Sequence, residues 1–151
     1  MIQAFTIRVY GILMDTHKNV LVSDEIIRGK FYTKFPGGGL EFGEGTIECL
    51  VREFKEETGL TISIKQHLYT TDFFQPSAFN ENDQVISIYY LVESNDINSL
   101  QISTTVYDFS EEQLSGKIQQ ENFRWIAIDE LNEDSVTLPI DKKVVSLIKR
   151  L

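Results

Sequence analysis

The sequence lacks the residues that several classes of protein require. It has one cysteine, Cys49, so it can form neither an internal disulfide nor a zinc site built from several thiolates. No apolar run approaches the roughly 18 residues of a membrane-spanning helix. The opening residues, MIQAFTIRVYG, also lack the parts of a secretory signal. We therefore expect a cytoplasmic protein in a reducing compartment.

Basic residues are scarce as well. The chain has 14 Lys and Arg against 23 Asp and Glu, which gives a formal net charge of −9. Because binding to a nucleic-acid duplex depends on clustered cations, this balance disfavours nucleic acid as a partner. A small phosphorylated molecule stays open as a partner, since a bound metal ion can reverse the local sign of charge.

Length and composition predict one domain. The 151 residues are 42% hydrophobic and 25% charged, which is ordinary for a globular chain. We find no internal repeat and no linker long enough to separate two domains. The expectation is therefore a single domain over residues 1–151.

Hydrophobic patterning predicts an α+β protein. Alternating or β-branched runs predict strands at residues 4–14, 20–22, 61–74, 84–93 and 123–128. The polar break at residues 15–19 predicts a hairpin between the first two strands. Helical spacing of apolar residues predicts two main helices, at residues 46–58 and 139–151.

The first predicted helix carries an unusual group of acidic residues. Its apolar stripe consists of Ile47, Leu50, Val51 and Phe54. The carboxylates of Glu53, Glu56 and Glu57 fall on an adjoining arc of the same helix.

Such close carboxylates repel one another unless a positive charge lies among them. Hard divalent cations bind carboxylate oxygens, and Mg²⁺ usually shares its remaining positions with water and substrate phosphates. The alternative is a plain solvated face, which is what most glutamate-rich helices present. The residues around the helix favour the metal site.

The segment PGGGLEFGEGTIECLVREFKEETGL at residues 36–60 resembles the signature of the Nudix hydrolases. Every fixed position of that signature is present, namely Gly38, Glu44, Arg52, Glu53, Glu56, Glu57 and Gly59. A weaker similarity extends to Trp125 and the following residues 129–131. The resemblance strictly covers about a sixth of the chain.

The resemblance implies an α/β/α sandwich built on a mixed sheet, in which the signature forms a loop, a helix and a loop. It also implies hydrolysis, dependent on Mg²⁺ or Mn²⁺, of the pyrophosphate bond in a nucleoside diphosphate linked to another moiety. ADP-ribose, nucleotide sugars and nucleoside triphosphates are substrates of that class. Similar proteins are often dimers, so a homodimer stays open.

Two other functions are compatible with the resemblance. The first is a Nudix-fold sensor that binds a nucleotide without cleaving it. Regulatory members usually add a DNA-binding module and often lose signature glutamates, whereas all of those glutamates are present here. The second is a structural interaction domain whose acidic helix is merely solvated.

The resemblance also assigns roles within the signature. Glu53, Glu56 and Glu57 are implied as metal ligands, and a backbone carbonyl near Gly37 is implied to complete the metal shell. The implied supporting residues, which hold the loop against the helix, are Gly38, Glu44 and Arg52.

A general base is also needed, and the resemblance leaves its identity open. It is either a signature glutamate, Glu53 or Glu56, or a glutamate on a downstream loop. We expect Glu121 in the loop role, with Glu111 and Glu112 as competitors.

The sequence says less about substrate contacts. Arg8 and Arg28 are candidates for contacts with phosphate or ribose. Pro76 falls at about the distance from the signature at which some ADP-ribose-cleaving members carry a proline, although loops favour proline in any case. His17 and His67 have no ligand-like spacing, and we expect both to be exposed structural residues.

Overall fold

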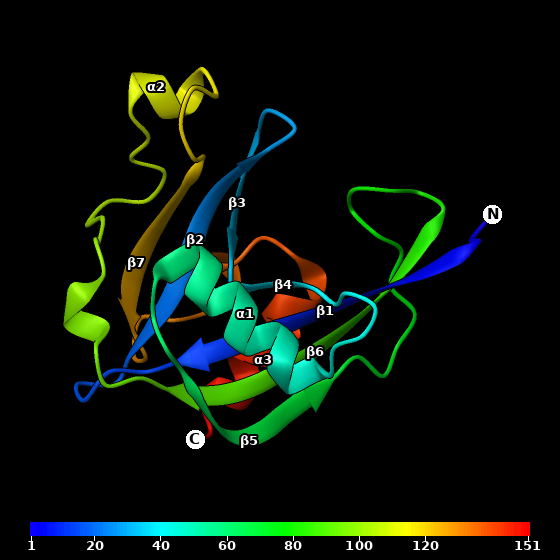
Figure 1. Cartoon of the computed structure of the whole chain (residues 1–151), viewed down its shortest axis with the longest axis horizontal. Helices are drawn as coiled ribbons and strands as arrows, with labels where there is room; N and C mark the ends of the chain where they lie inside the picture. Colours follow the sequence, from blue (N-terminus) through cyan, green and yellow to red (C-terminus); the bar gives the residue numbers. More distant parts are fainter. The chain divides into compact units, whose positions relative to one another are not determined.

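The computed structural model describes all residues 1–151, and the chain divides into two compact units. Unit 1 consists of Met1–Leu13 and Pro36–Asn98, and unit 2 consists of Met14–Phe35 and Ser99–Leu151. Figure 1 labels the elements of both units. None of the helices is long and apolar enough to cross a membrane.

Unit 1 contains a mixed four-stranded sheet. Its strands follow the order β4 (Gly37–Gly39), β1 (Ala4–Leu13), β6 (Asp83–Glu93) and β5 (Ser63–Thr70). Strand β1 runs parallel to β6 and antiparallel to β4, and β5 is antiparallel to β6. The β-branched and aromatic residues of β1 and β6 suit a pleated, half-buried surface. The mixed sheet is therefore confirmed.

Helix α1 (Thr46–Thr58) packs on β1 and β4, across one face of this sheet (Figure 1). It begins after Gly45, whose N–H donates to the Glu48 carboxylate at 3.1 Å, and it ends at Gly59 as predicted. Its buried residues are Cys49, Leu50 and Phe54. Ile47 is 48% exposed, so its predicted place in the apolar stripe is wrong.

Unit 2 contains a second sheet, in which all strand pairs are antiparallel. Its order is β3 (Lys30–Lys34), β2 (Asn19–Ile27) and β7 (Glu121–Ala127). Strands β2 and β3 form a hairpin around Arg28 and Gly29, with φ angles of 52° and 77°. Two positive φ angles in a two-residue loop give the turn twist that matches antiparallel strands.

The helices of unit 2 are α2 (Glu111–Leu114) and α3 (Pro139–Ile148), with a short 3₁₀ turn, η2 (Glu133–Ser135), before α3. Another 3₁₀ turn, η1 (Ile97–Ser99), lies where the chain passes from unit 1 to unit 2. Pro139 opens α3 as predicted, because its missing N–H costs nothing in the first turn. Helix α3 ends at Ile148, earlier than the predicted end at residue 151.

Two predicted features differ in the structure. The predicted hairpin is limited to one turn, in which Asp15 N–H donates to the Asn19 carbonyl at 3.0 Å and Met14 forms an isolated antiparallel bridge with Val20. Beyond that bridge, β1 and β2 belong to different sheets. The reason is that β1 pairs with β4 and β6 on its two edges. Glu121 is the first residue of β7, so it does not lie on a loop as expected.

A buried carboxylate joins the parts of unit 2. Asp24 of β2 is fully buried and accepts two hydrogen bonds from Arg124 of β7, at 2.7 and 2.9 Å. It also accepts from the Thr33 hydroxyl at 2.8 Å and from Tyr107 N–H at 3.3 Å. Because the charge is paired and hydrogen-bonded on every side, its burial is tolerated.

Replacing Asp24 with alanine tests this arrangement. We expect Asp24→Ala to lower the free energy of unfolding by about 3–5 kcal/mol, because it leaves the Arg124 cation without its partner. Urea denaturation at neutral pH measures the loss. Asp134→Ala removes an exposed aspartate from the same unit and serves as the control. Equal stabilities of the two variants would contradict the prediction.

Candidate functional site

A strand of three glycines lies against the acidic helix. Strand β4 pairs with β1, with Val9 opposite Gly38. A Cβ atom on Gly38 would lie 2.2 Å from the carboxyl carbon of Glu53. Gly37 has a φ of 155°, and a Cβ there would lie 2.0 Å from the Val9 carbonyl oxygen. Any larger residue at these positions would displace either the strand or the Glu53 carboxylate.

Arg52 of α1 ties the preceding loop to the helix. Its Nε and Nη2 atoms donate to the two oxygens of Glu44, at 2.9 and 2.6 Å. Nη2 also donates to the carbonyl oxygen of Gly39 at 3.1 Å. The two-pronged pair fixes both distance and orientation, which a single contact would not do.

The same guanidinium reaches the acidic residues of the helix. Nη1 donates to Glu53 at 3.0 Å and to Glu56 at 3.3 Å. A longer ion pair reaches Glu41 at 3.7 Å. The hydrogen bonds from Arg52 lower the pKa of Glu44 to about 2, and Glu44 and Glu53 in turn raise the pKa of Arg52. One cation thus offsets the repulsion among several carboxylates.

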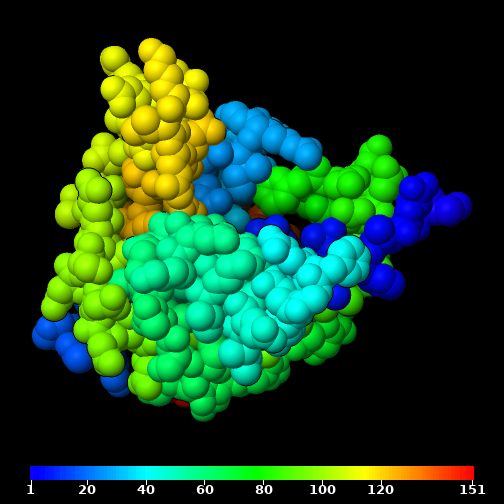
Figure 2. All heavy atoms as spheres, viewed as in Figure 1, coloured from blue at the N-terminus to red at the C-terminus, as the bar shows by residue number.

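The carboxylates differ in exposure. The side chain of Glu53 is 14% exposed and that of Glu56 is 58% exposed, while Glu57 is half-buried. Figure 2 shows α1 and the loop before it side by side on the surface of unit 1. A face of this kind offers carboxylate oxygens to a ligand from solvent.

The donor set fits a hard divalent ion. Glu53, Glu56 and Glu57 supply the oxygen atoms that Mg²⁺ and Mn²⁺ prefer, and the absence of a side chain at Gly38 makes room for the Glu53 carboxylate. The structure does not gather three or more acidic, histidine or cysteine side chains into a group that could hold a metal ion. The ligand roles of these glutamates and of Gly37 therefore stay predictions.

Glu121, which we predicted as the base on a loop, is contacted by several side chains of unit 2. It lies directly opposite Glu25 in the ladder between β7 and β2. The Ser23 hydroxyl is 2.9 Å from a Glu121 oxygen and 3.0 Å from a Glu25 oxygen. The Gln119 amide donates to the other Glu121 oxygen at 2.9 Å. Burial, and then the charge of Glu25, raise the pKa of Glu121 to about 7.

Three of these neighbours were missed by reasoning from the sequence. Ser23 and Glu25 lie next to Glu121, and the positive charge of Lys34 acts on it. The Lys34 ammonium lies 3.4 Å from the Glu25 carboxylate. The segment VLVSDEII at residues 20–27 contains a hint of these neighbours, because three polar residues stand within an otherwise apolar strand. Without the register of the strands, the sequence could not show which of them face Glu121.

The remaining candidates are placed as follows. Arg8 lies on β1 opposite Gly39 and donates to the Tyr10 hydroxyl at 2.7 Å. Arg28 lies in the exposed turn between β2 and β3, in the other unit. Glu111 and Glu112 are exposed residues of α2.

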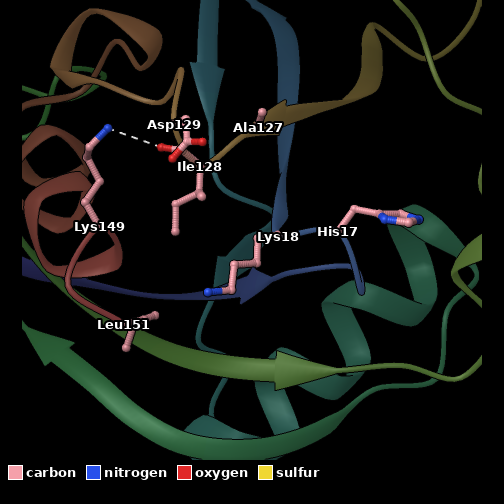
Figure 3. A pocket seen from close by; sticks show the side chains of 7 residues that line it. All are labelled: His17, Lys18, Ala127, Ile128, Asp129, Lys149 and Leu151. Carbon is pink, nitrogen blue, oxygen red and sulfur yellow. Dashed lines mark hydrogen bonds between the residues drawn. The ribbon is translucent and has the colours of Figure 1, made fainter.

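Unit 2 also contains a pocket of about 480 Å³, shown in Figure 3. It is lined by His17, Lys18, Ala127, Ile128, Asp129, Lys149 and Leu151. The Lys149 ammonium donates to the carbonyl oxygens of Ile128 at 3.2 Å and Leu131 at 2.6 Å. That cation therefore holds the end of α3 to the segment after β7. The pocket contains no residue that the signature singles out.

Comparison with known proteins identifies the family. The model of the NUDIX domain matches residues 4–147. A protein of Proteus vulgaris named 8-oxo-dGTP diphosphatase is 33% identical over 55 residues, which make up 35% of this chain and 49% of that protein. The matched segment thus spans about half the length of this relative.

Solved structures agree on the fold. A NUDIX hydrolase from Nitrosomonas europaea superposes with a TM-score of 0.67 at 18% identity, over 94% of this chain and 86% of its own. An ADP-ribose pyrophosphatase from Streptococcus suis gives a TM-score of 0.61 at 15% identity, over 96% and 90%. With the domain match covering nearly the whole sequence and the glutamate-rich signature complete, the chain belongs to the Nudix family of hydrolases.

Proposed function

We propose that this protein hydrolyses the pyrophosphate bond of a nucleoside diphosphate linked to another moiety, with a divalent ion held by Glu53, Glu56 and Glu57. The observation that carries the proposal is the face where Arg52 organises carboxylates beside Gly38. Acidic residues this close, on a helix fixed to a glycine strand, suit a positively charged ligand better than bulk water.

The metal assignment follows from the family and the donor chemistry. Nudix hydrolases are typically metal-dependent. A divalent ion bound at these carboxylates would neutralise phosphate charge and acidify water. The carbonyl of Gly37 is the proposed backbone ligand, since glycine adds no side chain of its own beside it. Gly38, Glu44 and Arg52 support the ligands from behind without contacting the substrate.

Glu121 is the proposed general base. In the reaction a water oxygen attacks phosphorus, the bond to the bridging oxygen breaks, and its electron pair leaves with the departing phosphate group. The carboxylate of Glu121 takes the proton that the water loses. A pKa of about 7 suits that task, because such a carboxyl is both ionised and basic near neutral pH.

The names of two similar proteins support the proposed substrate class. The relative in Proteus vulgaris is named for 8-oxo-dGTP, and a structural neighbour is named for ADP-ribose. Both compounds contain a nucleoside diphosphate. Arg8, beside Gly39 of the signature strand, is the better of the two arginine candidates for a phosphate contact, and Arg28 is the second.

A hydrolysis screen tests the proposed function. It uses the full chain with Mg²⁺ or Mn²⁺, and presents ADP-ribose, nucleotide sugars, diadenosine polyphosphates, nucleoside triphosphates and 8-oxo-dGTP, with product analysis. We expect at least one compound to be split at its pyrophosphate bond in a metal-dependent way. Nucleotide binding without turnover of any compound would favour a sensor instead.

Two substitutions test the metal ligands. Glu53→Gln and Glu57→Gln each keep the shape of the side chain but remove its charge, so we expect turnover to fall by about a hundredfold or more. Circular dichroism checks that the fold is intact. Glu81→Gln, which removes one charge from an exposed loop of the same unit, is the control and keeps full turnover. Normal turnover in both test variants would remove the metal assignment.

The base assignment has its own test. We expect Glu121→Gln to lower turnover by about a hundredfold, because an amide cannot take the proton from water. Metal affinity, measured by titration calorimetry, should stay unchanged. Glu133→Gln, which removes an exposed carboxylate from the same unit, is the control and keeps full turnover, while Glu112→Gln tests a competing candidate. If Glu121→Gln turns over normally, the base lies elsewhere, most simply among the signature glutamates.

A further inference from the structure

Two glutamates face each other across the sheet of unit 2. Glu25 and Glu121 form a directly opposed pair in the antiparallel ladder between β2 and β7. Like charges in that position destabilise a sheet. Lys34 compensates only in part, since its single ammonium contacts Glu25 at 3.4 Å. Two ionised carboxylates would therefore leave one negative charge uncompensated by a cation.

The hydroxyl between them limits how protons can be arranged. Ser23 is fully buried, and its oxygen lies within 3.0 Å of one oxygen from each glutamate. A serine hydroxyl has one proton, so it donates either one strong hydrogen bond to one carboxylate or a weaker three-centre bond shared by both. Both contacts become full hydrogen bonds only if one glutamate carries a proton and donates it to the serine oxygen.

We propose that Ser23 joins Glu25 and Glu121 into one unit that shares a proton, and that Glu25 is a positioning residue which sets the proton affinity of Glu121. The inference rests on the proposed role of Glu121 as the general base. Glu25 itself contacts no reacting atom. It acts through the opposed negative charge and through the bridging hydroxyl.

The groups facing Glu121 within unit 2 account for the direction of the effect. Glu25 raises the proton affinity of Glu121, while the Ser23 hydrogen bond and the Lys34 charge lower it. The Gln119 amide is neutral. Arg124 lies on the same strand but is bound to Asp24 through two hydrogen bonds. Burial together with Glu25 prevails, and the pKa of Glu121 rises to about 7.

The protonation state of the Glu25–Glu121 pair predicts how the reaction depends on pH. Below neutral pH the pair holds its proton, and Glu121 is a poor acceptor. As the pair loses that proton, Glu121 becomes able to take one from the attacking water, so turnover rises with pH. Removal of the Glu25 charge makes Glu121 ionise at lower pH and also makes it a weaker base.

Carboxyl-detected NMR tests the shared proton directly. The full chain, labelled with ¹³C and kept free of metal by a chelator, is titrated while the glutamate side-chain carbons are followed. We expect the Glu121 carboxyl to titrate in a step near pH 7. Glu25→Gln moves the Glu121 step down by at least about one pH unit, and Ser23→Ala moves it up. Glu112→Gln leaves it in place.

The two variants are expected to shift the pKa of Glu121 in opposite directions. A general loosening of the fold would instead lower this pKa in both variants, toward that of an ordinary glutamate. A Glu121 step below about pH 5.5 in the unmodified chain, or no shift in Glu25→Gln, overturns the proposal. With an active substrate, the acid limb of kcat/KM moves in the same directions as the NMR step. The titration needs no substrate, so its result does not depend on the hydrolysis screen. If no compound is hydrolysed in the screen, the proposed function is contradicted, while the NMR titration still tests the shared proton.

Discussion

The site in unit 1 depends on one guanidinium. Arg52 donates two hydrogen bonds to Glu44 and one to the Gly39 carbonyl. Its third nitrogen, Nη1, donates to Glu53 and Glu56. Without this cation the loop would lose these hydrogen bonds to the helix, and Glu53 and Glu56 would lose the positive charge that offsets their mutual repulsion. Lysine could not replace it, because an ammonium lacks the planar fork that holds a carboxylate in one orientation.

The pair in unit 2 has the opposite electrostatic character. Glu121 binds its proton more tightly in the folded chain than when unfolded, since its pKa rises from 4.5 to about 7. The stability that it contributes is therefore present below the lower value and is lost as pH rises toward the upper one. An opposed glutamate pair costs stability at neutral pH, and a strand under no other constraint would place a neutral or basic residue there.

Local signals were enough for some parts of the structure. Helix α1 matches its predicted bounds because the signals for its start and end lie within the helix and the residues directly beside it, such as Gly59 at its C-terminus. The hairpin expected between β1 and β2 extends no further than the bridge between Met14 and Val20, because strand partners are chosen by long-range pairing, as in the parallel ladder of β1 with β6. For the same reason Glu121 could be named as a candidate, while its neighbours Glu25 and Ser23 could not.

The two environments shift the acidity of a glutamate in opposite directions. Hydrogen bonds from Arg52 lower the pKa of Glu44 to about 2, so this carboxyl is ionised at neutral pH. Burial beside the negative charge of Glu25 raises the pKa of Glu121 to about 7. Carboxyl groups of equal intrinsic acidity thus acquire separate uses, one as a fixed anion in a scaffold and one as a group that exchanges its proton near neutral pH. The difference comes from what surrounds each glutamate. For Glu121 the surroundings include Glu25, which is far from it in the sequence but lies directly opposite it in the sheet.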